Sequence, residues 1–66
     1  MSDPVIAALR GRRMHLGLTQ RDLAAAIGAK QSAISEWESG AHVPMLTTLH
    51  RWAGALGLAI IAQEDK

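Results

Sequence analysis

Apolar residues recur every three or four positions along four stretches of the chain, which is the spacing of amphipathic helices. These stretches run from Pro4 to about Leu16, from Thr19 to Ile27, from Gln31 to about Glu38 and from about Met45 to Leu56. The positions expected to face inward are Val5, Ile6, Leu9, Leu16, Leu23, Ala24, Ile27, Ile34, Trp37, Leu46, Leu49, Ala53 and Leu56, with Trp52 covering the edge of the core. The pattern predicts an all-α fold with one four-helix domain over residues 1–66.

Capping residues support these boundaries. Asp3 can accept a hydrogen bond from a free amide of the first turn, and Pro4 suits the first helical position. Thr19 and Asp22 have the spacing of a capping box. Glycines at positions 17, 28, 40 and 57 are placed where each helix should end. Arg13 is unusual, because it falls on the inward side of the first helix.

The third predicted helix has few residues to bury. Only Ala29 and Lys30 separate it from the glycine that ends the second helix, so the two helices must cross at a steep angle. Behind its two apolar anchors, Ile34 and Trp37, its other flank carries Lys30, Gln31, Ser32, Ser35 and Glu36.

The final apolar run, residues 58–63, predicts a short β-strand rather than a helix, because it contains adjacent isoleucines and no capping signal. A single strand needs a neighbour for its amides and carbonyls, and the rest of the chain offers none. We therefore expect pairing with the same strand of a second molecule across a two-fold axis. The residues that would pair are Leu58, Ala59, Ile60, Ile61 and Ala62. The alternative is a tail or a last helical turn on its own domain.

Composition excludes several classes of protein. The sequence has no cysteine, no apolar run of about 20 residues and no signal-peptide layout, so we expect a cytoplasmic protein without redox chemistry or a membrane partner. His15, His42 and His50 lack metal-ligand spacing. The serines of the third helix have no oriented histidine or pocket, so we expect no enzyme, metal, cofactor or small-molecule ligand.

Charge is distributed unevenly along the chain. Residues 1–35 contain five basic and two acidic residues, whereas residues 36–66 contain two basic and four acidic ones. The first half could face a polyanion, although an ordinary solvated surface would have a similar composition.

The run LGLTQRDLAAAIGAKQSAISEWESG, residues 16–40, resembles the signature of the Cro and phage-repressor family, also called XRE-type regulators. The resemblance extends from Val5 to Gly57. It implies a lambda-repressor-like fold with a helix-turn-helix at residues 19–38. It also implies binding of double-stranded DNA, with helix 31–38 in the major groove.

The same resemblance assigns roles to individual residues. Gln31 matches a glutamine that reads adenine, and its amide has the donor and acceptor needed for adenine N6 and N7. The expected base contacts are Lys30, Gln31, Ser32, Ser35 and Glu36, and the expected phosphate contacts are Arg12, Thr19, Gln20 and Arg21. Glu36 departs from the family, and either accepts from a cytosine N4 or turns away. Arg12 and Arg21 could alternatively be solvated.

Two further expectations follow from the resemblance. Arg13 and Glu38 match an arginine and a glutamate that form an ion pair between the first and third helices. Gln20 matches a glutamine that contacts both a phosphate and the first residue of the recognition helix.

The closing segment resembles HipB-like antitoxins, whose dimers share a small strand pairing. The expected function is a homodimeric transcriptional repressor on a pseudo-palindromic operator, and it could be an autoregulatory antitoxin. The alternative is an adaptor that keeps the helix-turn-helix shape but binds a toxin protein and has little DNA affinity of its own.

Overall fold

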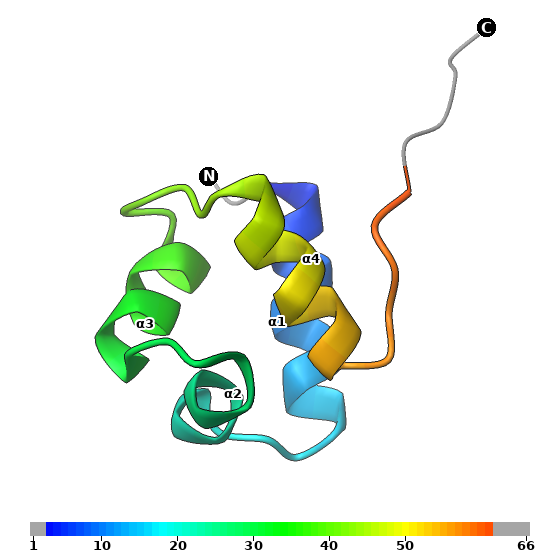
Figure 1. The fold of residues 1–66 in the computed structure, drawn as a ribbon, viewed down its shortest axis with the longest axis horizontal. Helices are drawn as coiled ribbons and strands as arrows, with labels where there is room; N and C mark the ends of the chain where they lie inside the picture. The colour runs from blue at the N-terminus through cyan, green and yellow to red at the C-terminus, as the bar shows by residue number, and fades with distance from the viewer. Residues whose placement is uncertain (1–2, 62–66) are drawn as a thin grey trace, which may run out of the picture.

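Four helices form the fold of the computed structural model, which describes residues 3–61 (Figure 1). They are α1 (Pro4–His15), α2 (Gln20–Ile27), α3 (Gln31–Ser39) and α4 (Leu46–Ala55). Each begins and ends within one residue of its predicted limits, and Thr19 is the capping residue that precedes α2. Within residues 3–61, no helix is long and apolar enough to cross a membrane.

The predicted capping interactions form. Asp3 Oδ1 accepts from the Val5 amide at 2.8 Å, at the start of α1. At the start of α2, the Asp22 amide donates to Thr19 Oγ1 at 3.0 Å and the Thr19 amide donates to Asp22 Oδ2 at 2.9 Å, which completes the capping box. Gly28 ends α2 with φ 70°, a left-handed conformation that favours glycine.

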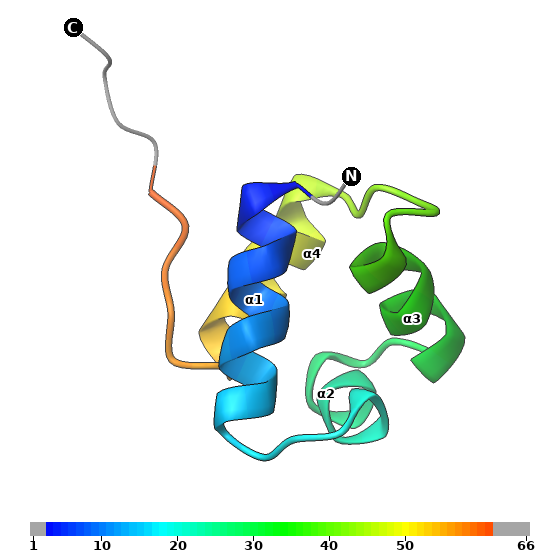
Figure 2. The same ribbon diagram turned by 180° about the vertical axis from the view of Figure 1, so that it is seen from behind.

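The helices surround one small core. The helix α2 packs against both α3 and α4, and α1 packs against α3 (Figures 1 and 2). The most completely buried large side chains are Trp52, Leu23, Ile34 and Leu56, and the core also contains Ile6, Leu9, Ala24, Ile27 and Ala53. All four helices therefore contribute to the same cluster.

The structure corrects the predicted core at several positions. Trp52 lies at the centre of the core with no exposed surface, not at its edge, and its ring centroid is 6.0 Å from that of Trp37. Trp37 is half-buried. Leu46 is 63% exposed, because it begins α4 and projects beyond the core, and Val5 and Leu16 are also exposed. These three residues lie in the first turn or at the capping position of a helix, where helical spacing no longer guarantees a neighbouring element.

The segment after α4 forms no strand over Leu58–Ile61, the part of the predicted strand that is described. The Leu58 amide donates to the Ala53 carbonyl at 2.8 Å, which closes the end of α4. Ile60 is half-buried against the core. The segment then runs beside α1 (Figure 2). Ala62 and Gln63 lie outside the described residues, so pairing with a second molecule stays a prediction.

A buried ion pair joins α1 to α3. Arg13 Nε donates to Glu38 Oε2 at 2.7 Å, and the second terminal nitrogen of Arg13 donates to Glu38 Oε1 at 2.9 Å. The remaining terminal nitrogen of Arg13 donates to the Leu18 carbonyl at 2.7 Å. Both charged residues are more than nine-tenths buried. This geometry explains why an arginine lies on the inward side of α1.

Removing one partner of this pair should be much more harmful than replacing both. In Glu38→Ala, Arg13 loses two of its three hydrogen-bonding interactions and keeps a buried charge, so we expect unfolding to become easier by roughly 3–5 kcal/mol. The double variant Arg13→Met/Glu38→Leu, which buries no charge, should lie closer to the wild type. Chemical denaturation measures both, and equal stability of the two variants would contradict the role of the pair.

The capping box of α2 should make stability depend on pH. The backbone amide of Thr19, followed by its side chain, stabilises the ionised carboxylate and lowers the pKa of Asp22 below its usual 3.8. A lowered folded-state pKa contributes stability above the unfolded value, and that contribution is lost as pH falls through the folded value. The stability difference between wild type and Asp22→Ala should therefore shrink between neutral pH and strongly acidic pH. A difference that stays constant in thermal melts would contradict this.

Candidate nucleic-acid interface

A three-residue turn sets the angle between α2 and α3. After the left-handed Gly28, the Ala29 amide donates to the Ala24 carbonyl at 2.9 Å. Lys30 is extended, with φ −86° and ψ 146°, and its carbonyl accepts from the Ala33 and Ile34 amides in the first turn of α3. The turn therefore ends α2 and starts α3 within a few residues, as a helix-turn-helix requires.

The outer face of α3 is polar and exposed. Ile34 is fully buried and Trp37 is half-buried, so these two side chains anchor the helix. The residues expected to read bases, Lys30, Gln31, Ser32, Ser35 and Glu36, are all exposed. Within residues 3–61, the first four make no side-chain hydrogen bond or ion pair. Their donors and acceptors therefore remain available to a partner.

Glu36 differs from its four neighbours. Its Oε2 lies 3.4 Å from Nε2 of His42, in the loop that follows α3. Both side chains are more than half exposed, so this contact contributes little to stability. The Glu36 carboxylate therefore lies toward the loop after α3, and its part in base contact stays a prediction.

The residues at the start of α2 are partly occupied by intramolecular bonds. The Thr19 hydroxyl accepts the capping bond from the Asp22 amide. Gln20 is half-buried, and its Nε2 donates to Glu38 Oε1 at 3.1 Å, so its side-chain amide contacts the ion pair rather than Gln31. Arg21 is exposed. Gln20 therefore links the start of α2 to the buried ion pair of Arg13 and Glu38.

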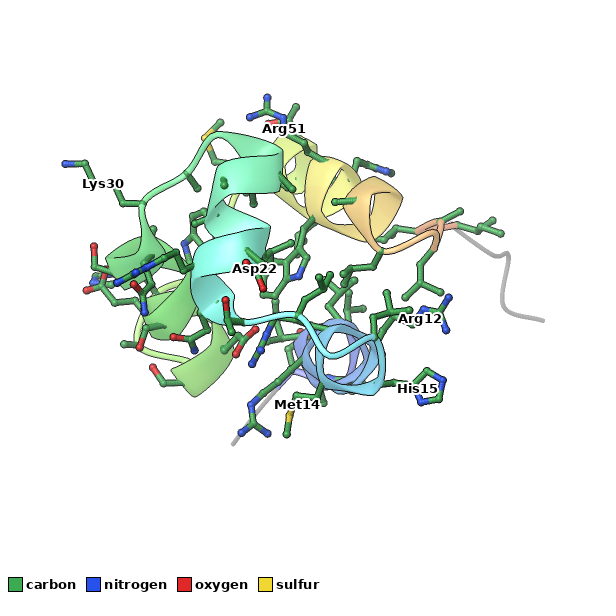
Figure 3. All side chains as sticks on the ribbon, turned by 90° about the horizontal axis from the view of Figure 1, so that it is seen from below. Arg12, Met14, His15, Asp22, Lys30 and Arg51 are labelled. Atoms are coloured by element: carbon green, nitrogen blue, oxygen red, sulfur yellow. The ribbon has the colours of Figure 1, made fainter. Side chains whose placement is uncertain are left out.

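Arg12 contacts the end of α4. It is half-buried, and its Nε donates to the Leu56 carbonyl at the end of α4, at 3.1 Å. Figure 3 shows Arg12 and Lys30 at opposite sides of the molecule. Of the four expected phosphate contacts, Thr19, Gln20 and Arg21 are consecutive at the start of α2, whereas Arg12 lies on α1 and bonds to the end of α4.

Arg10 lies beside Gln20 and the polar face of α3, although the sequence motif does not single it out. Its Nε lies 3.8 Å from Glu38 Oε1, and its side chain is 56% exposed. It lines a recess of about 450 Å³ together with Gln20 and Ser35. The sequence signal that could have identified Arg10 is its position three residues before Arg13, which puts both arginines on neighbouring turns of one helix face.

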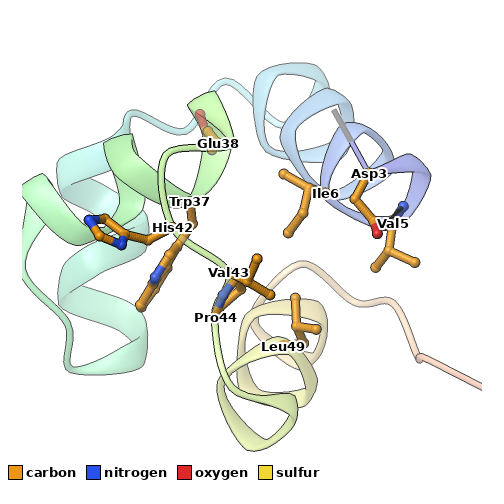
Figure 4. Close-up of a pocket in the computed structure, with 10 residues that line it drawn as sticks. Asp3, Val5, Ile6, Trp37, Glu38, His42, Val43, Pro44 and Leu49 are labelled. Carbon is orange, nitrogen blue, oxygen red and sulfur yellow. Dashed lines mark hydrogen bonds between the residues drawn. The ribbon is translucent and has the colours of Figure 1, made fainter. Parts of the chain in front are cut away.

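A second, more apolar cavity of about 220 Å³ lies on another side of α3 (Figure 4). It is bounded by the start of α1, the end of α3, the following loop and α4, with Trp37, Pro44 and Leu49 among its lining residues. Within residues 3–61, no group of three or more acidic or histidine side chains could hold a metal ion.

Comparison with known proteins agrees with this geometry. The family described as Helix-turn-helix matches residues 9–61. One relative, from Methanothermobacter thermautotrophicus, is named as an uncharacterized HTH-type transcriptional regulator. It is 43% identical over 49 residues, which cover 74% of this chain and 71% of the relative. The family match spans most of the chain and includes α2, the turn and α3. The protein therefore belongs to the XRE-type helix-turn-helix family.

Proposed function

We propose that this protein binds double-stranded DNA in a sequence-specific manner and regulates transcription as a homodimeric repressor. The observation that carries the proposal is the exposed polar face of α3, where Lys30, Gln31, Ser32 and Ser35 have no side-chain partner within the described residues. Family membership and the name of the relative support DNA binding and transcription regulation.

The recognition helix α3 would lie in the major groove, which is wide enough to admit one helix. The side-chain amide of Gln31 would form two hydrogen bonds with adenine: its carbonyl oxygen would accept from N6, and its amino group would donate to N7. The hydroxyls of Ser32 and Ser35 can donate or accept, so they tolerate more than one base. Lys30 would reach a guanine edge or a phosphate. Glu36 would take part only by leaving His42 to accept from a cytosine N4.

Phosphate contacts would position the protein along the DNA backbone. Thr19, Gln20 and Arg21 stand at the start of α2, where free backbone amides also favour anions. Arg12 donates only its Nε–H to the Leu56 carbonyl, so it would contribute through its terminal nitrogens. Binding should weaken steeply with salt, because each contact releases counterions.

A homodimer would form through the segment after α4. The amides and carbonyls of residues 59–61 make no backbone hydrogen bond within the described part of the chain, so they are available to a second strand. Pairing of Leu58, Ala59, Ile60, Ile61 and Ala62 across a two-fold axis would set two recognition helices about 34 Å apart, one helical turn of DNA. An autoregulatory antitoxin, as in HipB-like proteins, would use the same geometry.

A second candidate is an adaptor that binds a toxin protein. It is favoured by the exposed apolar side chains of Val43, Met45 and Leu46, which are 90%, 73% and 63% exposed. Val43 also lines the cavity beside Trp37. A partner protein could bury these residues without covering the polar face of α3.

Gln31→Ala should separate the two candidates. Because the amide would contact a base edge, we expect the variant to lose roughly 1–3 kcal/mol of discrimination at one base pair and to keep its non-specific affinity. Competitive binding with single-base operator variants measures this loss. Unchanged sequence preference would remove Gln31 from base reading, and a simultaneous loss of toxin binding would favour the adaptor.

Removing residues 59–66 should convert the dimer to a monomer in sedimentation, while the Leu58 bond to Ala53 that closes α4 is kept. The matched control is Val43→Ser/Leu46→Ser in the full chain, which changes the other exposed apolar surface and should remain dimeric. If the truncated chain stays dimeric and the control becomes monomeric, the interface lies at the loop between α3 and α4.

A further inference from the structure

We infer that Arg10 is a DNA phosphate contact, and that it performs on α1 the role that the sequence resemblance assigns to Arg12. This inference rests on the proposed DNA binding. It identifies the recess between α1 and α3 as the place where a backbone phosphate beside the recognition helix would bind.

The position of the recess is the first argument. Its lining includes Arg10 and Gly11 from α1, Gln20 from α2, and Ser35 and Ser39 from α3. Ser35 belongs to the exposed polar face of α3, and Gln20 is the first residue of α2. The recess is therefore continuous with the surface that would face DNA, whereas the Arg12 guanidinium is bonded to the end of α4.

The balance of charge is the second argument. Among the described residues that line the recess, Glu38 is the only one with an acidic group. It already accepts two hydrogen bonds from Arg13 and one from Gln20, and its side chain is only 3% exposed. Arg13 and Arg10 together carry two positive charges against the single negative charge of Glu38, which leaves a net positive charge at the mouth of the recess. This positive charge would attract an anion that approaches the recess from solvent.

The hydrogen-bonding capacity of Arg10 is the third argument. At 3.8 Å, its Nε is too far from Glu38 Oε1 for a hydrogen bond, and within residues 3–61 its guanidinium donates to no other group. Five N–H donors are therefore available in a fork that suits phosphate oxygens. Gln20 Nε2 has a second N–H beside the one given to Glu38. Together the two side chains can bind one phosphate from two directions.

The test is the salt dependence of operator binding by the full-length protein. Each phosphate contact contributes about −0.9 to the slope of log K against log salt, so Arg10→Gln should make the slope of a dimer shallower by about 1.8. Affinity should fall by a similar factor for all sequences, because a phosphate carries no base identity. Arg10→Lys keeps the charge and should keep the slope.

The matched control is Arg51→Gln, which removes the same charge from α4, where Arg51 bonds to the Ile27 carbonyl. Its slope should equal that of the wild type. An equal change in Arg51→Gln would mean a general effect of charge, and a change in Arg12→Gln but not in Arg10→Gln would restore Arg12 as the contact. Either result would overturn the inference.

Two further outcomes separate this inference from the proposed function. If the wild type binds operator and Arg10→Gln keeps the full slope, only the role of Arg10 is wrong. If the wild type binds no duplex at low salt, both are wrong.

Discussion

The rest of the structure depends on the hydrogen bonds that the buried carboxylate of Glu38 accepts. This carboxylate receives Arg13 from α1 and Gln20 from α2 while it belongs to α3, so three helices meet at one buried charge. A chain of 66 residues can bury only a small apolar core, and such a core leaves helix orientations weakly specified. A bidentate ion pair has a fixed geometry, so it also fixes the orientation of α3 relative to α1. The ion pair therefore helps to hold α3 in place while the polar face of this helix stays exposed to a partner.

This arrangement divides the candidate interface into two parts. Lys30, Gln31, Ser32 and Ser35 have no side-chain partner within the described residues, so they would gain their hydrogen bonds on binding. Thr19 and Gln20 are already held by intramolecular bonds, which restricts their motion before any partner arrives. Base reading would thus depend on adaptable side chains, and positioning on side chains that are already fixed.

Much of the fold could be predicted from the sequence because its signals are local. Asp3, the Thr19–Asp22 capping box and the helix-ending glycines are short-range features, and all of them fix helix ends as expected. The errors at Leu16 and Leu46 fall at helix ends, where burial depends on whether another element happens to cover the residue. The central position of Trp52, inside α4, could not be predicted for a different reason, since only the assembled helices show which residue is central.

The candidate site was predictable to a similar degree. The exposed face of α3 follows from its two apolar anchors, Ile34 and Trp37, because helical spacing alone puts the polar residues opposite them. The choice between Arg10 and Arg12 could not be made in this way. Consecutive residues of a helix differ by about 100° in direction, so Arg12 points well away from Arg13, and the Leu56 carbonyl that receives it comes from a distant part of the chain.

Selection of bound sequences from a random duplex library tests the central claim most directly, because it examines the recognition face and the dimer together. A dimer with α3 in successive major grooves predicts enrichment of a pseudo-palindrome whose half-site centres are about 10 base pairs apart. Adenine should be enriched at the position that Gln31 reads. Recovery of unenriched sequences, at salt concentrations where the protein still binds DNA, would contradict sequence-specific recognition by the polar face of α3.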